Sequence, residues 1–113
     1  MNQEEINAKI LQFFGNIEKY YDCKTEITEG LYTKNHSDDV DFVTWNMAEF
    51  NLVRSAYRKK GNRFMIEGSK FYYEISAENI ISLEQPGRNK FEFIEQYGSS
   101  VFRITKIKFQ YKY

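Results

Sequence analysis

Cysteine, histidine and proline each occur only once in this sequence of 113 residues. The single cysteine, Cys23, cannot form a disulfide within the chain, and one cysteine with one histidine does not supply a usual structural zinc site. The six glycines stand apart from one another, at positions 15, 30, 61, 68, 87 and 98, so no glycine-rich phosphate-binding loop is present. These absences disfavour disulfide-stabilised proteins, zinc-binding proteins and nucleotide-dependent enzymes.

Long hydrophobic runs are also missing. No stretch of apolar residues approaches the roughly 18 that a membrane-spanning helix needs, so no contact with a membrane is expected. The first five residues contain two glutamates and no basic side chain, which argues against a secretion signal. A single cysteine agrees with a reducing compartment, and we therefore expect a cytoplasmic protein.

Aromatic residues, in contrast, are abundant. The chain contains ten Phe, nine Tyr and one Trp, and 42% of its residues are hydrophobic. Aromatic rings fit the pleated, half-buried surface of a sheet and supply large apolar areas to a core. Since the length is close to that of a usual domain, the sequence predicts one compact domain spanning residues 1–113, with an aromatic core.

Near the N-terminus, apolar residues recur at steps of three and four, which is the spacing of one helix face. This pattern predicts a helix from about residue 3 to residue 21. Asn2 can cap its first turn while Glu5 reaches back, an asparagine variant of the capping box. The expected buried residues are Ile6, Ile10, Phe14, Ile17 and Tyr21.

The segment after Asn46 fits the two-residue period of a strand as well as the period of a helix. End signals favour a helix over residues 47–60, because Asn46 and Glu49 resemble a capped start and Gly61 suits a left-handed cap. Three basic residues before Gly61 would face the negative end of the helix dipole. The predicted buried stripe consists of Met47, Phe50, Val53 and Tyr57.

The remaining segments predict strands. One short strand is expected over residues 27–32 and another over 40–45, separated by a polar loop at 35–39. A hairpin is expected over 63–75, with Glu67 opposite Lys70 and Gly68 supplying a positive φ at the turn. Further strands are expected over 79–84, 90–96 and 101–112, with a turn at Pro86–Gly87 and a bulge near Thr105. The predicted fold class is α+β, with two helices packed on an antiparallel sheet of about five to seven strands.

Charge is distributed unevenly along the chain although the formal net charge is zero. Residues 1–49 contain four basic and ten acidic side chains, whereas residues 50–113 contain twelve and six, so the halves carry −6 and +6. Fields of one sign steer association with charged partners. The asymmetry predicts a macromolecular partner without identifying it.

Three groups of residues are candidate binding sites. An acidic group in the polar loop suits a basic partner surface, a basic group suits phosphates and base edges, and the last strand alternates lysines with aromatic rings. The last pattern also fits an edge strand protected by lysines. The groups are Asp38, Asp39 and Asp41; Arg54, Arg58, Lys59, Lys60 and Arg63; and Lys106, Lys108, Tyr111, Lys112 and Tyr113.

Catalytic and metal-binding arrangements are incomplete. His36 has no nucleophile motif beside it, so we predict no catalytic residues. The acidic loop could hold a hard cation but lacks the glycine and terminal glutamate of an EF-hand, and no metal or cofactor is predicted.

The resulting expectation is a small non-enzymatic protein-binding module, such as an inhibitor or a regulatory accessory protein, whose partner is another protein. The alternative is a nucleic-acid-binding protein that uses the basic group and the hairpin after it. An enzyme acting through the acidic loop and a carrier with an aromatic ligand pocket remain open.

Overall fold

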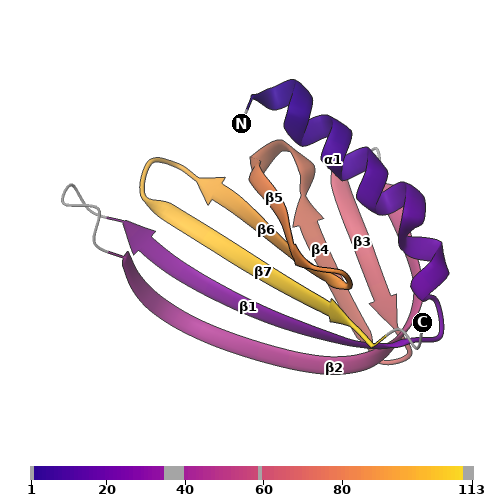
Figure 1. Ribbon diagram of the computed structural model, residues 1–113. Helices are drawn as coiled ribbons and strands as arrows, with labels where there is room; N and C mark the ends of the chain where they lie inside the picture. The colour runs from indigo at the N-terminus through magenta and orange to yellow at the C-terminus, as the bar shows by residue number, and fades with distance from the viewer. Residues whose placement is uncertain (1, 35–39, 59, 111–113) are drawn as a thin grey trace.

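One N-terminal helix and one seven-stranded antiparallel sheet make up the fold (Figure 1). The computed structural model describes residues 2–34, 40–58 and 60–110, and for residues 40–43 it describes only the backbone. The elements are α1 (Gln3–Asn16), the 3-10 helix η1 (Ile17–Tyr20), β1 (Lys24–Lys34), β2 (Val40–Arg58), β3 (Arg63–Gly68), β4 (Phe71–Ser76), the 3-10 helix η2 (Ala77–Asn79), β5 (Ile80–Gly87), β6 (Lys90–Tyr97) and β7 (Val101–Phe109).

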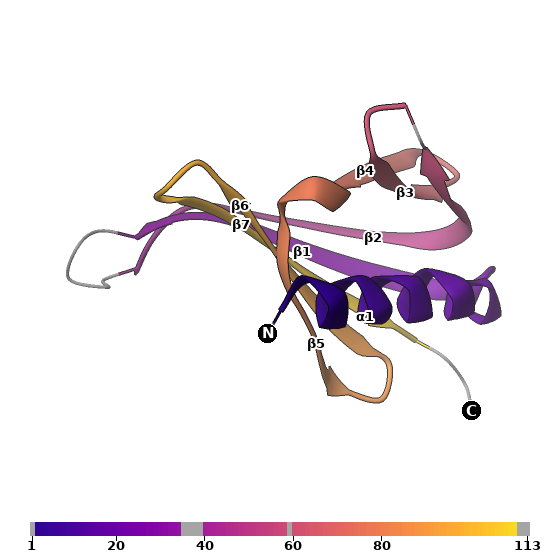
Figure 2. The same ribbon diagram turned by 90° about the horizontal axis from the view of Figure 1, so that it is seen from above.

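The strand order in the sheet is β4-β3-β2-β1-β7-β6-β5, and all neighbouring strands are antiparallel. The two edge strands, β4 and β5, follow one another in the chain and are joined by η2. Figure 2 shows the sheet curling so that the β3–β4 hairpin and the β5–β6 turn rise on either side of α1. The helix therefore lies in a trough on one face of the sheet. The opposite face carries no helix and forms the outer face of the molecule.

The start of α1 agrees with the predicted cap. The backbone N–H of Glu5 donates to Oδ1 of Asn2 over 2.9 Å, and the Asn2 amide reaches back to the Glu5 carboxylate at 3.5 Å. The buried stripe, however, differs from the prediction: Phe13 and Tyr20 are buried, whereas Phe14 and Tyr21 are partly exposed. The helix ends at Asn16 and continues as η1, and this tighter helix places Tyr20 three residues after Ile17 on the buried face.

One continuous core joins the helix to the sheet. Rings of α1 pack on rings of β3 and β6: Phe14 stacks on Phe64 at 4.0 Å between centroids, and Phe13 meets Phe93 edge-on at 5.0 Å. Tyr20 of η1 stacks on Phe109 at 4.0 Å. The predicted aromatic core is present. Among the described residues, no helix combines the length and the apolar character needed to cross a membrane.

The predicted second helix is wrong, because residues 40–58 form the long strand β2. Asn46 does not cap a helix; its side chain donates to Glu29 on the neighbouring strand over 3.1 Å. Of the predicted buried stripe, Met47 is 70% exposed, while Leu52, which the helical pattern omitted, is fully buried. Local end signals favoured a helix, but the segment pairs with neighbouring strands instead: residues up to 51 pair with β1, and residues 52–58 pair with β3.

The predicted β3–β4 hairpin is present, but its register differs by two residues. Gly68 pairs with Phe71, rather than Glu67 with Lys70. A shift of two keeps each side chain on its predicted face, so Phe64 and Ile66 still face inward. Gly68 does not have a positive φ; a Cβ there would lie 2.7 Å from Cδ2 of Phe50, so ring packing requires the glycine.

The C-terminal hairpin also departs from expectation in three details. Strand β7 lies between β1 and β6, so it is not an edge strand. Its pairing with both neighbours is regular through Thr105, without the predicted bulge. Pro86 and Gly87 end β5, and the turn itself falls at residues 88–89. The apolar residues at even and at odd positions of β7 therefore lie on opposite faces, so both faces of this strand carry apolar side chains.

Candidate functional site

The outer face of the sheet, opposite α1, carries a group of apolar side chains. Alternation along β1, β2, β6 and β7 directs one set of residues toward the core and the other outward. We call the outward set the outer apolar surface: Tyr32, Trp45, Met47, Ile94, Phe102 and Ile104.

The centre of this surface is a row of residues paired directly across four strands. Trp45 lies opposite Gly30, Gly30 opposite Ile104, and Ile104 opposite Ile94. A Cβ on Gly30 would lie only 2.8 Å from Cζ3 of Trp45, so the indole ring covers the glycine backbone. On the next outward row Tyr32 stacks on Phe102 at 5.1 Å between ring centroids. Direct cross-strand pairs thus hold the apolar side chains in one contiguous group.

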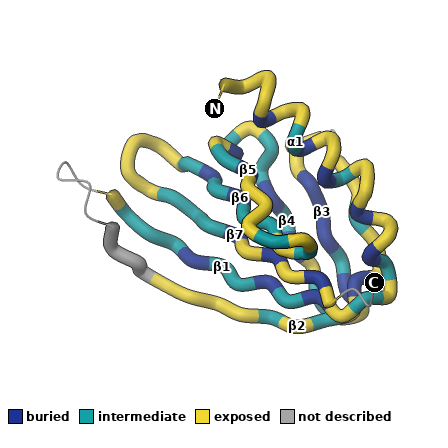
Figure 3. The backbone as a smooth tube through the Cα atoms, in the orientation of Figure 1, coloured by how far each residue is buried: buried dark blue, intermediate teal, exposed yellow. Residues whose placement is uncertain are grey.

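Two members of the outer apolar surface are strongly exposed. Met47 is 70% exposed and Trp45 is 49% exposed. Figure 3 shows the exposed stretch along β2 in yellow, beside the grey residues. Trp and Met are enriched in protein interfaces relative to the rest of protein surfaces. Their exposure on a rigid central sheet makes this surface the leading candidate for binding.

Charged residues border the outer apolar surface. The Lys106 ammonium lies 5.8 Å from the centroid of the Trp45 ring and 3.9 Å from a carboxylate oxygen of Glu92. A hollow of about 170 Å³ beside them is lined in part by Lys90, Lys106, Lys108, Glu26 and Glu92. Of the predicted C-terminal group, Lys106 and Lys108 are therefore brought to this face, whereas Tyr111, Lys112 and Tyr113 lie outside the described residues.

The predicted basic group is on the sheet, not on a helix, and its arginines have partners. Arg54 Nε lies 2.7 Å from Oε2 of Glu67, and Arg63 Nη1 lies 3.1 Å from Oε1 of Glu74. Arg58 donates to the hydroxyl of Tyr72 over 3.1 Å. The Tyr72 hydroxyl, followed by Arg63, lowers the pKa of the Glu74 carboxyl. Lys60 is exposed, and Lys59 lies outside the described residues.

The predicted acidic group cannot be placed as a site. Asp38 and Asp39 lie outside the described residues, as does His36, and only the backbone of Asp41 is described, opposite Thr33 of β1. Within the part of the chain that the structure describes, no three histidine, cysteine or acidic side chains gather closely enough to hold a metal ion.

A buried polar cluster on the inner face was not predicted. It is centred on Arg103 of β7, whose Nε lies 2.9 Å from Oε2 of Glu29 and whose Nη1 lies 3.4 Å from Oε1 of the fully buried Glu95. Nη1 also donates to the carbonyl of Glu74 over 3.0 Å, and the guanidinium lies 4.4 Å from the Tyr73 ring centroid. We call Glu29, Tyr73, Glu95, Tyr97, Arg103 and Thr105 the Arg103 cluster.

The remaining contacts of the Arg103 cluster hold β4 against β6 and β7. Oε2 of Glu95 accepts from the backbone N–H of Ser76 at 3.0 Å and from the Tyr97 hydroxyl. The Tyr73 hydroxyl lies 2.6 Å from Oγ1 of Thr105. Burial raises the pKa of Tyr73 to about 12, and burial together with Glu95 raises the pKa of Tyr97 to about 12. Both phenols are therefore neutral at physiological pH, and these contacts tie β4 to β6 and β7 across the inner face of the sheet.

Sequence reasoning missed both features for related reasons. The outer apolar surface had one signal in the sequence. Within residues 102–113, apolar residues occupy even positions first and odd positions later, and this change was interpreted as a bulge. The Arg103 cluster had no local signal, because Glu29, Glu95 and Arg103 meet only through strand pairing.

Comparison of the chain with family models, with curated proteins and with solved structures finds no match.

Proposed function

We propose that this protein is a small non-enzymatic protein-binding module that binds its partner through the outer apolar surface. The observation that carries the proposal is the contiguous row from Trp45 to Ile94 across four strands, with Met47 beside Trp45 exposed at 70%. An apolar centre with aromatic and methionine side chains and a charged border is the usual anatomy of a protein interface. Such a module would act by covering a partner's surface, as an inhibitor or accessory subunit does.

The border charges support a protein partner over a nucleic acid. Acidic residues accompany the lysines around the hollow, and Glu92 lies near Lys106. Binding to phosphates would favour a surface of one sign. In the basic group, Arg54 and Arg63 are paired with Glu67 and Glu74. The proposed partner therefore presents an apolar ridge flanked by charges of both signs.

We also propose that the protein is not an enzyme, and the positions of its titratable groups support this. The titratable groups with the most perturbed environment belong to the Arg103 cluster, where Arg103, Glu95 and Tyr97 contact one another. The residues that line the hollow on the outer face are different ones. Because the groups of the Arg103 cluster hold strands together, a structural role is favoured for them over a catalytic one.

A capture experiment with matched variants tests the proposal. Tagged wild-type protein, Met47→Glu and Leu11→Glu are exposed to native lysate with and without nuclease treatment. Leu11 is a suitable control because it is 72% exposed, as Met47 is 70% exposed, but lies on α1. We expect a nuclease-resistant protein to be retained by the wild type and by Leu11→Glu, and to be lost from Met47→Glu.

Three results would contradict the proposal. A partner retained equally by Met47→Glu would place binding elsewhere on the molecule. Loss from both variants would indicate nonspecific apolar adhesion. Capture that disappears with nuclease would favour the alternative, a nucleic-acid-binding protein using Arg54, Arg58 and Arg63.

A further inference from the structure

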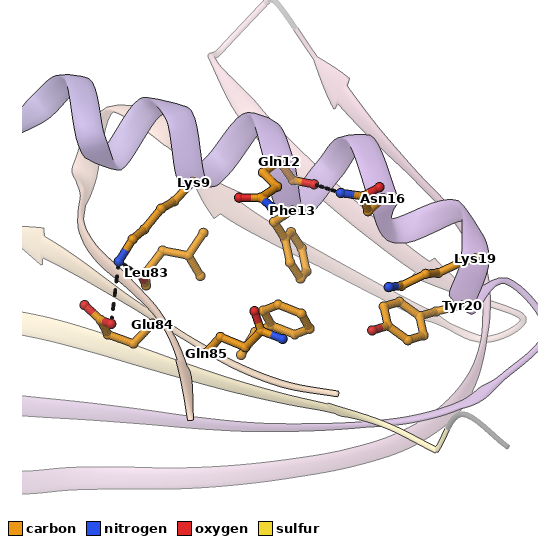
Figure 4. Close-up of a pocket in the computed structure, with 10 residues that line it drawn as sticks. Lys9, Gln12, Phe13, Asn16, Lys19, Tyr20, Leu83, Glu84 and Gln85 are labelled. Carbon is orange, nitrogen blue, oxygen red and sulfur yellow. Dashed lines mark hydrogen bonds and ion pairs between the residues drawn. The ribbon is translucent and has the colours of Figure 1, made fainter. Parts of the chain in front are cut away.

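A groove on the opposite side of the molecule from the outer apolar surface lies between α1 and the edge strand β5. Its volume is about 350 Å³, which falls in the lower part of the range of roughly 300–1,000 Å³ typical of small-molecule sites. Residues from α1, η1, β5 and β6 line it, and Figure 4 shows most of them. A carrier with an aromatic ligand pocket was left open by the sequence, and this groove lies at the edge of the aromatic core rather than inside it.

The floor of the groove is aromatic. Phe13 of α1 and Phe91 of β6 line it and meet edge-on, with their ring centroids 4.7 Å apart. Tyr20 forms one end, and its ring is held by stacking on Phe109. Phe13 and Tyr20 are only 5% and 2% exposed, so the partly exposed Phe91 offers most of the aromatic surface to a ligand. Contacts with Phe13 and Phe109 hold the Phe91 ring in place, which lowers the entropic cost of binding.

The walls of the groove are polar and carry two ammonium groups. The Lys9 Nζ donates to the carbonyl of Leu83 over 3.3 Å and lies 3.6 Å from the Glu84 carboxylate, so its charge is already paired. Lys19 is different: it lies 5.1 Å from the centroid of the Tyr20 ring, and none of the described carboxylates forms an ion pair with it. Figure 4 shows its ammonium directed toward the groove beside the Tyr20 hydroxyl.

Side-chain amides complete the walls. Gln12 and Asn16 of α1 and Gln85 of β5 line the groove. The Asn16 amide nitrogen donates to the backbone carbonyl of Gln12 over 2.8 Å, and that of Gln85 donates to the carbonyl of Arg88 over 2.9 Å. Each of these amide nitrogens has a second N–H, which can donate to a ligand carboxylate without breaking those contacts.

We infer that the groove binds a small aromatic carboxylate, with its ring on Phe91 and its carboxylate at Lys19. The unpaired cation at one end supplies charge complementarity, and the fixed ring supplies the apolar contact. The volume suits a ligand of one or two fused rings. This site is independent of the proposed protein-binding surface, so either can fail without the other.

The inference is tested by titrating the wild-type protein with 2-naphthoate and following backbone amide shifts by ¹⁵N NMR. Saturable shifts are expected at Gln12, Asn16, Lys19 and Gln85. Removing the charge in Lys19→Gln should weaken binding about three- to fivefold, the effect of one partly exposed ion pair. Lys70→Gln is the matched control, because Lys70 is an exposed lysine in the turn between β3 and β4, and its affinity should equal that of the wild type.

A neutral analogue, 2-naphthalenemethanol, separates the role of the charge from that of the ring. It should bind several-fold more weakly than the carboxylate. Equal affinity of the two compounds, an unchanged dissociation constant in Lys19→Gln, or shifts confined to residues outside the groove would each overturn the inference. Binding only of acidic peptides, with no shift caused by 2-naphthoate, would also overturn it.

Discussion

Arg103, on β7, contacts three other strands through one guanidinium group. It pairs with Glu29 on β1 and Glu95 on β6, and it donates to a backbone carbonyl of β4. A buried ion pair is weak evidence of net stability, but removing one partner leaves the other charge buried without compensation. The Arg103 cluster is therefore the place where single substitutions should have the largest effect.

Arg103→Met should lower the free energy of unfolding by about 3–5 kcal/mol, because Glu95 would remain buried without its cation. The double variant Arg103→Met, Glu95→Gln should recover part of this loss. Urea denaturation measures both, with Arg54→Met as the control, since the exposed Arg54–Glu67 pair should contribute little. A loss in Arg103→Met no larger than in the control would contradict the account.

The phenols of Tyr73 and Tyr97 make a prediction about alkaline pH. The pKa values of Tyr73 and Tyr97 are raised to about 12 in the folded protein, whereas an unfolded chain has tyrosine pKa values near 10. Their contribution to stability is complete below about pH 10 and is lost as the pH rises toward 12. Absorbance at 295 nm should show late ionisation of these phenols, compared with Tyr73→Phe and Tyr97→Phe. Ionisation of all nine tyrosines near pH 10 would contradict this.

At the scale of elements, α1 and β2 show what a local pattern can and cannot predict. The start of α1 was predictable, because Asn2 and Glu5 cap the helix through contacts within one turn. Residues 47–60 carried similar end signals, but residues 47–58 belong to strand β2, because pairing with residues five to 27 positions away decides the outcome. The faces of the β3–β4 hairpin were also predictable, whereas its register was not, since a shift of two preserves the faces.

The candidate site residues also divide into those that a local pattern predicts and those that depend on strand pairing. Lys106 and Lys108 were correctly placed on one face of a strand, because alternation alone fixes that. Their neighbour Trp45 comes from β2, two strands away in the sheet, and could not be assigned without the strand order. Glu92 lies on the adjacent strand β6 and could not be assigned without the register of that hairpin. The Arg103 cluster also forms only through strand pairing. For this reason its charged residues could not be recognised as ion-pair partners from the sequence.

Two glycines give a paired prediction about elements. Gly68→Ala would place a Cβ 2.7 Å from the Phe50 ring and 3.1 Å from the carbonyl oxygen of Asn51, so it should destabilise the protein by about 1–3 kcal/mol. Gly15→Ala meets nothing within 4 Å in α1 and should stabilise it by up to about 1 kcal/mol. Thermal unfolding distinguishes the two. The same sign for both substitutions would contradict the described packing of β2 on β3.

At the scale of the whole molecule, the charge asymmetry along the chain is reduced by the fold. Ion pairs join the acidic N-terminal part to the basic C-terminal part, as in Glu29 with Arg103, while Lys9 pairs with Glu84 in the opposite sense. Strand β1 lies directly beside β7, so Glu26 is opposite Lys108. The described surface is therefore a mixture of charges around an apolar centre, and this mixture supports a protein partner.

The most direct test of the outer apolar surface uses its single tryptophan. Because Trp45 is the only tryptophan in the chain, replacing it biosynthetically with 5-fluorotryptophan gives one ¹⁹F NMR resonance from the centre of the surface. Addition of the partner obtained by capture should shift or broaden that resonance, and Met47→Glu should abolish the change. A partner that binds stoichiometrically and leaves the Trp45 resonance unchanged would contradict the proposed binding surface.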